Sequence, residues 1–275
     1  MGRSWFRLVI GAALISLTTL SAADAQDFQQ SYRISAGGVI DIRNVSGQIK
    51  VNGYDGDMIT VSGIKEGRDR DLVQIEDHSD GNHVELRARY LEPCNCDRSI
   101  MKTCDCDARV TFQVYVPRRG NYRYEQLSSV SGNIEVSDAS GRLSAKSVSG
   151  DVIVRNAEGF VSVSAVSGSV RVQGVAGAVS AKSLSGDVEV ALTRLEGEEV
   201  MQFSSMSGSI RLKLPSAIDA NIEMSTSTGS LKTDFPIQVE SRRHGSGQRA
   251  NGQIGNGSQH LRLRSFSGDV SLLRY

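Results

Sequence analysis

An 18-residue repeat constrains the fold of this chain more than any other feature of its sequence. Each copy places Ser-Gly before a polar residue and an alternating apolar pair, and the glycines are Gly132, Gly150, Gly168 and Gly186. A second set of glycines halves the period to nine: Gly141, Gly159 and Gly177. Each half-period has room for a strand of about four to six residues and a tight turn, in which glycine supplies the positive φ.

Looser copies of the unit extend the repeat over most of the chain. They begin at Ser46, Ser207, Thr228 and Ser267. Identical segments at a fixed period indicate stacked repeats, so we predict an all-β parallel β-solenoid (β-helix) with 18-residue coils of two short strands. An antiparallel meander or β-sandwich also needs frequent turns, but it has no reason to repeat the same turn on the same edge.

Alternation within the repeats assigns side chains to two walls. One wall points Leu143, Ala145 and Ser147 inward, together with their equivalents 18 and 36 residues later, and the opposite wall points Val152 and Val154 inward. Stacking at this register predicts an outward column that consists of Glu135, Ile153, Arg171, Glu189 and Arg211. Opposite charges are neighbours over the last three members of this column, which cross-strand pairing favours.

The first 25 residues are expected to be a signal peptide rather than part of the fold. Arg3 and Arg7 precede an apolar run from Leu8 to Leu20, and Ala23-Asp24-Ala25 matches the small-x-small pattern before a cleavage site. We therefore predict export to the periplasm, outer surface or extracellular space, with no membrane span after signal cleavage. The alternative is an uncleaved N-terminal anchor, for which the apolar run is short.

Residues 26–275 are predicted to form a single domain. Residues 26–127 would form irregular N-terminal coils with an inserted Cys hairpin at 90–110, and residues 128–240 would form the regular repeats. The stretch 241–258 lacks apolar periodicity and is expected to be a flexible loop. Residues 259–275 return to the motif, so we expect them to cap the stack.

Four cysteines form a C-x-C-x7-C-x-C pattern inside the predicted hairpin: Cys94, Cys96, Cys104 and Cys106. In an oxidising compartment, two disulfides of nested or crossed connectivity are expected. A tetrathiolate zinc site is the alternative, but the usual zinc spacing is C-x2-4-C. The expected role of the disulfides is to staple a long loop.

Other chemical candidates favour structural explanations. The run from Glu76 to His83 holds donors for a metal, yet its Ser-Asp-Gly-Asn centre is typical of a hairpin turn. The recurring Ser-Gly lacks the G-x-S-x-G pattern of a nucleophile elbow. The column Asn133, Asp151, Ser169 and Asp187 lacks the regular Asp and paired Gly of calcium-binding nonapeptide repeats. We predict no catalytic, metal-binding or cofactor-binding residues, and no cofactor.

The charge balance excludes one class of partner. The chain carries 31 basic and 31 acidic residues. Without a basic excess, nucleic acid is not an expected partner. No cluster of three or more acids is predicted on one wall, so paired carboxylates for glycoside cleavage cannot be assigned.

The S-x-S-G-[DNS]-[VI]-x-[VL] units, seen from Ser129 to Leu272 with an early copy at Asn44 to Val51, support a family resemblance. They resemble the bacterial putative-adhesin family of β-strand-repeat proteins, known as domain of unknown function 4097. This resemblance implies an exported β-solenoid with no established catalytic residues and an adhesion or surface role. The Cys hairpin is outside the repeat pattern of that family.

We therefore expect a non-enzymatic envelope or surface protein, an adhesin that binds a cell-surface polymer or an envelope protein through a solenoid wall. Repeat proteins use such extended surfaces for binding. One alternative is a solenoid carbohydrate-active enzyme, which a cluster of acids on one wall would favour. Another is a structural or signalling component of the cell envelope, which a specific protein partner would reveal.

Overall fold

The computed structural model describes residues 27–92, 94, 106–197, 199–241 and 247–275, and the predicted signal peptide lies outside them. The described residues are all-β, with 23 strands and one 3₁₀ turn, Arg70–Leu72. No helix among these residues is long and apolar enough to cross a membrane. The strands are β1 (Phe28–Tyr32), β2 (Val39–Ser46), β3 (Ile49–Tyr54), β4 (Ile59–Glu66), β5 (Val73–Asp77), β6 (His83–Tyr90), β7 (Arg109–Pro117), β8 (Asn121–Ser131), β9 (Ile134–Ser137), β10 (Ser140–Ser147), β11 (Val152–Arg155), β12 (Glu158–Ala165), β13 (Val170–Ala176), β14 (Val179–Ser183), β15 (Val188–Arg194), β16 (Met201–Ser205), β17 (Ile210–Leu214), β18 (Ala220–Thr228), β19 (Leu231–Thr233), β20 (Val239–Ser241), β21 (Gln248–Ile254), β22 (Gln259–Ser267) and β23 (Val270–Arg274).

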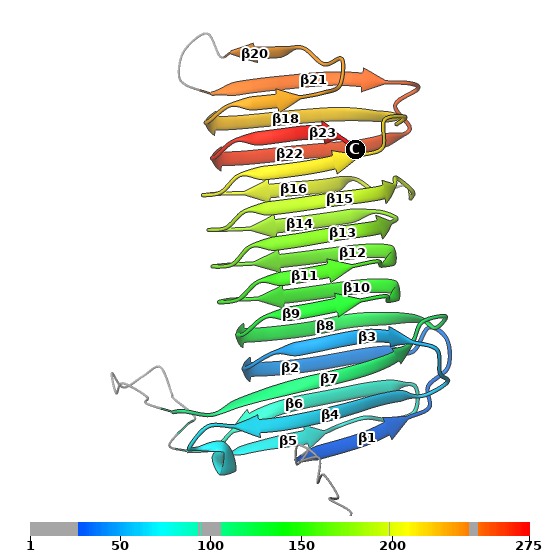
Figure 1. Cartoon of the computed structure of the whole chain (residues 1–275), viewed down its shortest axis with the longest axis vertical. Helices are drawn as coiled ribbons and strands as arrows, with labels where there is room; N and C mark the ends of the chain where they lie inside the picture. The colour runs from blue at the N-terminus through cyan, green and yellow to red at the C-terminus, as the bar shows by residue number, and fades with distance from the viewer. Residues whose placement is uncertain (1–26, 93, 95–105, 198, 242–246) are drawn as a thin grey trace, which may run out of the picture.

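Strand pairing arranges the chain as two walls that run the length of an elongated stack (Figure 1). The first wall has the order β5-β6-β2-β8-β10-β12-β14-β16-β22-β18-β21-β20. The second wall has the order β1-β4-β7-β3-β9-β11-β13-β15-β17-β23-β19. Pairing is parallel throughout the middle of both walls, which gives a mostly parallel, solenoid-like fold.

The 18-residue register predicted from the sequence is confirmed in the middle of the stack. Leu143 pairs with Val161, which pairs with Val179 in the next coil of the first wall. On the second wall Val152 pairs with Val170 in the same way. The spacing then lengthens to 22 residues between Val188 and Ile210, because a longer connection precedes β16.

The core lies between the walls and consists mainly of β-branched and aliphatic side chains. Valines at the inward positions of β11, β13 and β15 are 0–1% exposed. Rings enter where the coils are irregular, and the largest fully buried ones are Tyr124, Phe112 and Phe203. Each buried Val, Leu or Ile contributes about 1.5–3 kcal/mol relative to an exposed one, so the columns of small side chains stabilise the packing of the two walls.

The Ser-Gly glycines stack on one another, and this corrects the role predicted for them. Gly132, Gly150, Gly168 and Gly186 do not adopt positive φ; that conformation belongs to the other set, for example Gly159 at +106°. A Cβ at Gly168 would overlap the carbonyl oxygen of Gly150 in the preceding coil. Glycine is required there because successive coils approach too closely for any side chain.

Two hydrogen-bond ladders run beside this glycine column. The Ser183 hydroxyl donates to the carbonyl of Gly168 at 2.8 Å, and serines of other coils repeat the contact. The Asp151 carboxylate accepts the backbone N–H of Ser169 at 2.8 Å, and Asp187 accepts that of Ser209 at the same distance. Side chains therefore satisfy backbone groups at the turn that the strands leave unpaired.

Coil order departs from chain order at both ends of the stack. The β2–β3 coil lies between the strands β6 and β7 on one side and β8 and β9 on the other. At the other end, the β22–β23 coil lies between β16–β17 and β18–β19 (Figure 1). Residues 259–275 were expected to cap the stack, and that prediction is wrong: antiparallel β20 and β21 close the first wall there.

Two other predictions about irregular segments also need correction. Much of the expected loop 241–258 is strand β21, which pairs with β18 and buries Ala250, while residues 242–246 lie outside the described residues. Most of the expected hairpin 90–110 lies outside the described residues, and the flanking strands β6 and β7 belong to opposite walls and pair with other strands. Sequence proximity suggested a hairpin, whereas the hydrophobic faces of both strands pack into the common core.

Candidate functional site

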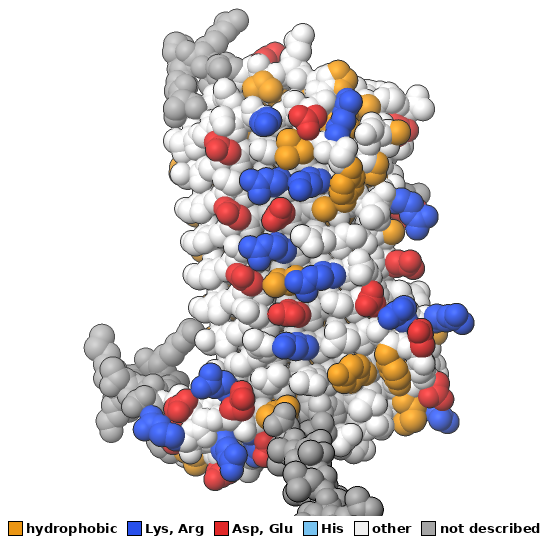
Figure 2. Space-filling model, in the orientation of Figure 1, with side chains coloured by type: hydrophobic (Ala, Val, Ile, Leu, Met, Phe, Trp, Pro, Cys, Tyr) orange, Lys and Arg blue, Asp and Glu red, His pale blue; other side chains and the backbone are white. Residues whose placement is uncertain are grey.

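The second wall presents rows of alternating charge on a flat surface. Arg171 lies between Asp151 and Glu189, at 4.0 and 3.7 Å, and Glu189 also contacts Arg211 at 3.8 Å. In Figure 2, Lys and Arg side chains alternate with Asp and Glu side chains along the middle of the stack. The predicted outward column is therefore confirmed, and its members are 18 or 22 residues apart because each belongs to a successive coil.

A groove of about 270 Å³ lies in this charged region of the second wall. Its polar lining includes Ser169, Asp187, Ser209, Asp269 and Ser271, next to the charged column. The pKa of Asp269 is below its ordinary value because the backbone N–H and the hydroxyl of Ser230 donate to its carboxylate. The groove therefore offers guanidinium groups, carboxylates and hydroxyls over several adjacent coils. Such a surface can hydrogen-bond a polar chain that lies along the stack.

The first wall differs because its outward column alternates serine with cations. Ser128, Lys146, Ser164 and Lys182 pair in this order, and Ser204 and Arg264 continue the column. Within the described part of the chain, neither Lys146 nor Lys182 forms an ion pair. The first wall is thus positively charged in its middle, whereas Arg171 and Arg211 of the second wall are paired with carboxylates.

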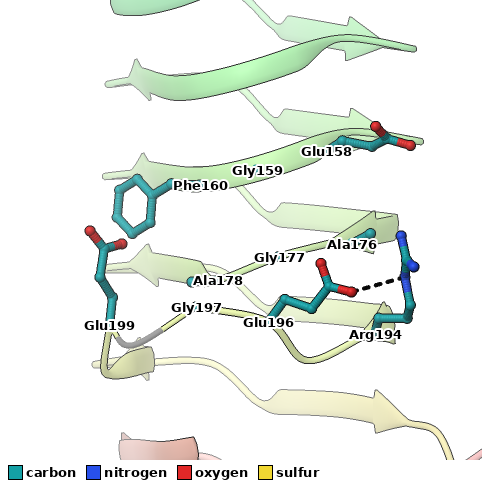
Figure 3. A pocket seen from close by; sticks show the side chains of 10 residues that line it. All are labelled: Glu158, Gly159, Phe160, Ala176, Gly177, Ala178, Arg194, Glu196, Gly197 and Glu199. Atoms are coloured by element: carbon teal, nitrogen blue, oxygen red, sulfur yellow. Dashed lines mark ion pairs between the residues drawn. The ribbon is translucent and has the colours of Figure 1, made fainter. Parts of the chain in front are cut away.

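A larger pocket, of about 530 Å³, lies at the corner opposite the Ser-Gly turns (Figure 3). Glu158, Glu196 and Glu199 line it together with Phe160 and Arg194. Glu196 pairs with Arg194 at 3.3 Å. Glu199 pairs with Arg142 at 3.5 Å, and the guanidinium of Arg142 lies 4.4 Å from the centre of the Phe160 ring. Arginines thus hold two of the three carboxylates.

The other candidates from the sequence have structural roles. Residues between β5 and β6 form the hairpin turn expected from the sequence, closed by backbone bonds between Asp80 and His83. His78 contacts Glu76 and His83 contacts Asp41, both at 3.3 Å, so the two histidines are directed at different carboxylates. The Asp column that could have bound calcium instead accepts backbone N–H groups of the next coil.

One disulfide joins Cys94 to Cys106, which confirms the disulfide prediction for this pair. Cys96 and Cys104 lie outside the described residues. Asp69 is close enough to both described sulfurs to complete a three-ligand cluster, but the sulfurs are bonded to each other rather than free as thiolates. Asp69 accepts the backbone N–H of Asp107 at 2.9 Å, so its carboxylate closes the same segment.

Sequence reasoning named the charged column but missed the groove and the corner pocket. The groove could have been found, since Asp187 and Asp269 occupy the position after Ser-Gly in their coils. The pocket depends on Glu196 and Glu199, which lie in the long connection between β15 and β16 where the period of 18 fails. No repeat signal marks those residues.

The repeat architecture agrees with a protein-family match over residues 126–273, to the family described as Toastrack DUF4097. The chain belongs to this family. The matched region begins within β8 and reaches β23, so it covers the regular coils and the out-of-order coil at the C-terminal end. The family resemblance predicted from the S-x-S-G units is therefore confirmed. A comparison with curated proteins gives no match.

Similar solved structures include a putative adhesin from Bacteroides fragilis, with 15% identity and a TM-score of 0.44 over 90% of this chain and 96% of that one. A putative lipid binding protein from Parabacteroides distasonis is 13% identical, with a TM-score of 0.42 over the same shares. A putative cell adhesion protein from Clostridium sporogenes is 10% identical, with a TM-score of 0.39 over 90% of this chain and 99% of that one.

Proposed function

We propose that this Toastrack DUF4097 protein is a non-enzymatic, exported binding module that holds a cell-surface polymer or an envelope protein against its second wall. The observation that carries the proposal is the groove flanked by Arg171, Glu189 and Arg211, whose charged groups repeat from coil to coil. A partner lying along the stack would contact equivalent side chains in several coils. Many weak contacts then add up without any single enclosed pocket.

The chemistry of the groove favours a hydroxyl-rich or charged polymer over an apolar ligand. Its lining is dominated by guanidinium, carboxylate and hydroxyl groups. Because the ion pairs between arginines and carboxylates beside the groove are exposed, each stabilises the folded chain by only about 0–1 kcal/mol, so a ligand can replace them at little cost. A partner that donates to Glu189 and accepts from Arg171 would keep both groups hydrogen-bonded.

The test is a binding array of glycans and cell-wall polymers with residues 26–275, with product analysis on every ligand that binds. We expect saturable binding without turnover, and a loss of at least tenfold in affinity in the Arg171→Ala/Arg211→Ala variant. Arg33→Ala is the matched control, because Arg33 also forms an exposed ion pair, with Asp57 at 3.6 Å, but in the N-terminal coils. Equal loss in both variants would contradict a site in the groove.

The same assay separates the alternatives. Release of sugar products would favour a carbohydrate-active enzyme, for which Glu158, Glu196 and Glu199 of the corner pocket would be the first residues to substitute. Binding to no polymer, with capture of one defined envelope protein, would favour the structural or signalling role. The array is repeated with reduced protein, because loss of binding on reduction would implicate the Cys94–Cys106 segment.

A further inference from the structure

An apolar ridge runs along the Ser-Gly corner of the stack, beside the groove proposed above, and none of the ridge residues lines that groove. It consists of the residue between the two serines, or their equivalents, in seven successive coils: Val45, Val130, Val148, Val166, Leu184, Met206 and Phe266. Each of these side chains is 41–61% exposed. We call this column the apolar ridge.

Inter-coil hydrogen bonds hold the ridge in one continuous line. Ser167 N donates to the carbonyl of Val148, Ser185 N to that of Val166, and Ser207 N to that of Leu184. Ser267 N then donates to Met206, which places Phe266 next in the column. Seven coils at about 4.8 Å spacing give a ridge about 29 Å long. A continuous exposed apolar strip of this length on a folded protein indicates an interaction surface.

Charges flank the ridge asymmetrically. On the first wall, two residues before the ridge, Lys146, Lys182 and Arg264 face outward. On the second wall, three residues after the ridge, the same three coils carry aspartates: Asp151, Asp187 and Asp269. The coils between them carry uncharged residues at both positions, for example Ser164 with Ser169 and Ser204 with Ser209.

These cations and carboxylates do not pair with each other inside the chain. Lys146 and Lys182 form no ion pair among the described residues, and Arg264 contacts Glu223 at 3.4 Å. Asp187 accepts the N–H of Ser209 with one oxygen, and no cation pairs with it in the described part of the chain. The coil that begins the ridge departs from this pattern. It has Arg43 two residues before the ridge but the uncharged Gln48 three residues after it, and Arg43 pairs with Glu85 at 3.5 Å.

We infer that the apolar ridge is a self-association surface, on which a second copy of this chain packs its own ridge in parallel. A two-fold axis along the stack brings the cation side of one copy against the carboxylate side of the other, at the same coil level. Lys182 of each copy would then face Asp187 of the other, twice per dimer. The antiparallel arrangement would place cations against cations and carboxylates against carboxylates, which like-charge repulsion opposes.

Charge complementarity also favours a second copy over a lipid surface. Anionic lipids attract a polybasic strip, and amphipathic membrane-binding surfaces are rich in Lys and Arg beside their apolar face. Here three cations lie two residues before the ridge and three aspartates lie three residues after it, so the strip carries little net charge. Only a partner with the same two-sided polarity matches it, and this chain supplies one.

The test measures the oligomeric state of residues 26–275 by sedimentation velocity over a range of concentrations. We expect a reversible dimer in the natural protein and monomers in Lys182→Asp and in Asp187→Lys, because each substitution sets like charges against each other across the two-fold axis. An equimolar mixture of the two variants should dimerise again, because every facing pair is then opposite in sign. Lys213→Asp, on the second wall away from the ridge, is the matched charge control and should dimerise normally.

A variant of the ridge itself guards against misfolding at the charged positions. Leu184→Ser should raise the dimer dissociation constant by about tenfold or more, since the side chain is removed twice per dimer. Tyr115 lies outside the ridge and is 41% exposed, compared with 45% for Leu184, so Tyr115→Ser should leave dimerisation unchanged.

Natural protein that stays monomeric would overturn the inference. Cosedimentation of such monomers with phosphatidylglycerol vesicles would assign the ridge to a membrane. Polymer binding is scored separately, so either proposal can fail alone.

Discussion

Replacing Gly168 with alanine tests the close stacking of coils on which the whole fold depends. The new Cβ would overlap the carbonyl oxygen of Gly150 and lie 2.6 Å from its carbonyl carbon. Both are backbone atoms held by the strands of the preceding coil, so the two coils must separate locally. This separation would weaken the hydrogen bonds that cross the turn.

Three such bonds surround the substituted residue. Ser167 N donates to Val148 O, Ser169 N donates to Asp151 Oδ1 and the Ser183 hydroxyl donates to the carbonyl of residue 168, each at 2.8 Å. At about 1 kcal/mol net for each bond, the expected loss is about 3 kcal/mol. That is a large fraction of the stability of roughly 5–15 kcal/mol that a folded protein has.

The assay is urea unfolding of residues 26–275 followed by far-ultraviolet circular dichroism. Gly37→Ala is the control: Gly37 has a φ of +80°, and a Cβ there would meet nothing within 4 Å. Only backbone strain remains at Gly37, which costs about 1–2 kcal/mol. Equal losses in the two variants, or a loss below about 1 kcal/mol for Gly168→Ala, would refute the stacking argument.

Three further predictions concern the turn ladders and the disulfide. Ser183→Ala should lower the free energy of unfolding by about 1 kcal/mol, because the hydrogen bond to the Gly168 carbonyl is lost. Ala165→Ser should be neutral or slightly stabilising, because a serine at this equivalent position would donate to a glycine carbonyl that lacks this partner. Equal urea midpoints for the two variants would contradict the ladder. Replacing Cys94 and Cys106 with Ser, in a background without the other two cysteines, should lower the free energy of unfolding by about 3 kcal/mol, because the disulfide closes a loop with a sequence separation of 12. An unchanged melting temperature would argue against a stapling role. Because the pKa of Asp269 is lowered in the folded chain, its carboxylate stabilises the fold above the ordinary Asp pKa, and this contribution disappears as the pH falls through the lowered value. Asp269→Asn should therefore lose less stability than the natural protein on acidification below about pH 4. Parallel profiles of stability against pH would contradict this assignment.

The period of 18 allowed much of the middle of the stack to be predicted. Once Gly150 and Gly168 are aligned, alternation fixes Val161 and Val179 as inward neighbours and Glu189 as an outward neighbour of Arg171. These relations depend only on strand periodicity and parallel stacking. The alternating charges of the column were visible in the sequence for the same reason.

The ends of the stack could not be predicted in this way, because local periodicity does not specify which coil lies next to which. The Ser46-Gly47 and Ser267-Gly268 copies match the motif equally well whether they cap the stack or lie inside it. Their placement follows from the longer connections, which carry antiparallel strands to each end. Strand β21 was missed because its sequence is polar and contains Gly252, although pairing with β18 satisfies its backbone.

The role of the turn glycines was mispredicted because two physical demands select the same residue. Positive φ and close backbone approach both require glycine, and the sequence alone does not separate them. In this chain Gly159 meets both demands, because its φ is +106° and a Cβ there would overlap the carbonyl oxygen of Gly141, whereas Gly168 meets only the second. The apolar ridge was likewise hidden, since the variable position of S-x-S-G is apolar in many copies but becomes a continuous surface only after stacking.

Amide chemical-shift mapping of isotope-labelled residues 26–275, with the polymer selected by the array, would show whether a partner lies along the second wall. We expect perturbations at Arg171, Glu189 and Arg211, spread over at least three coils and absent from Lys146 on the first wall. Perturbations confined to the corner pocket around Phe160, or to the first wall, would contradict it.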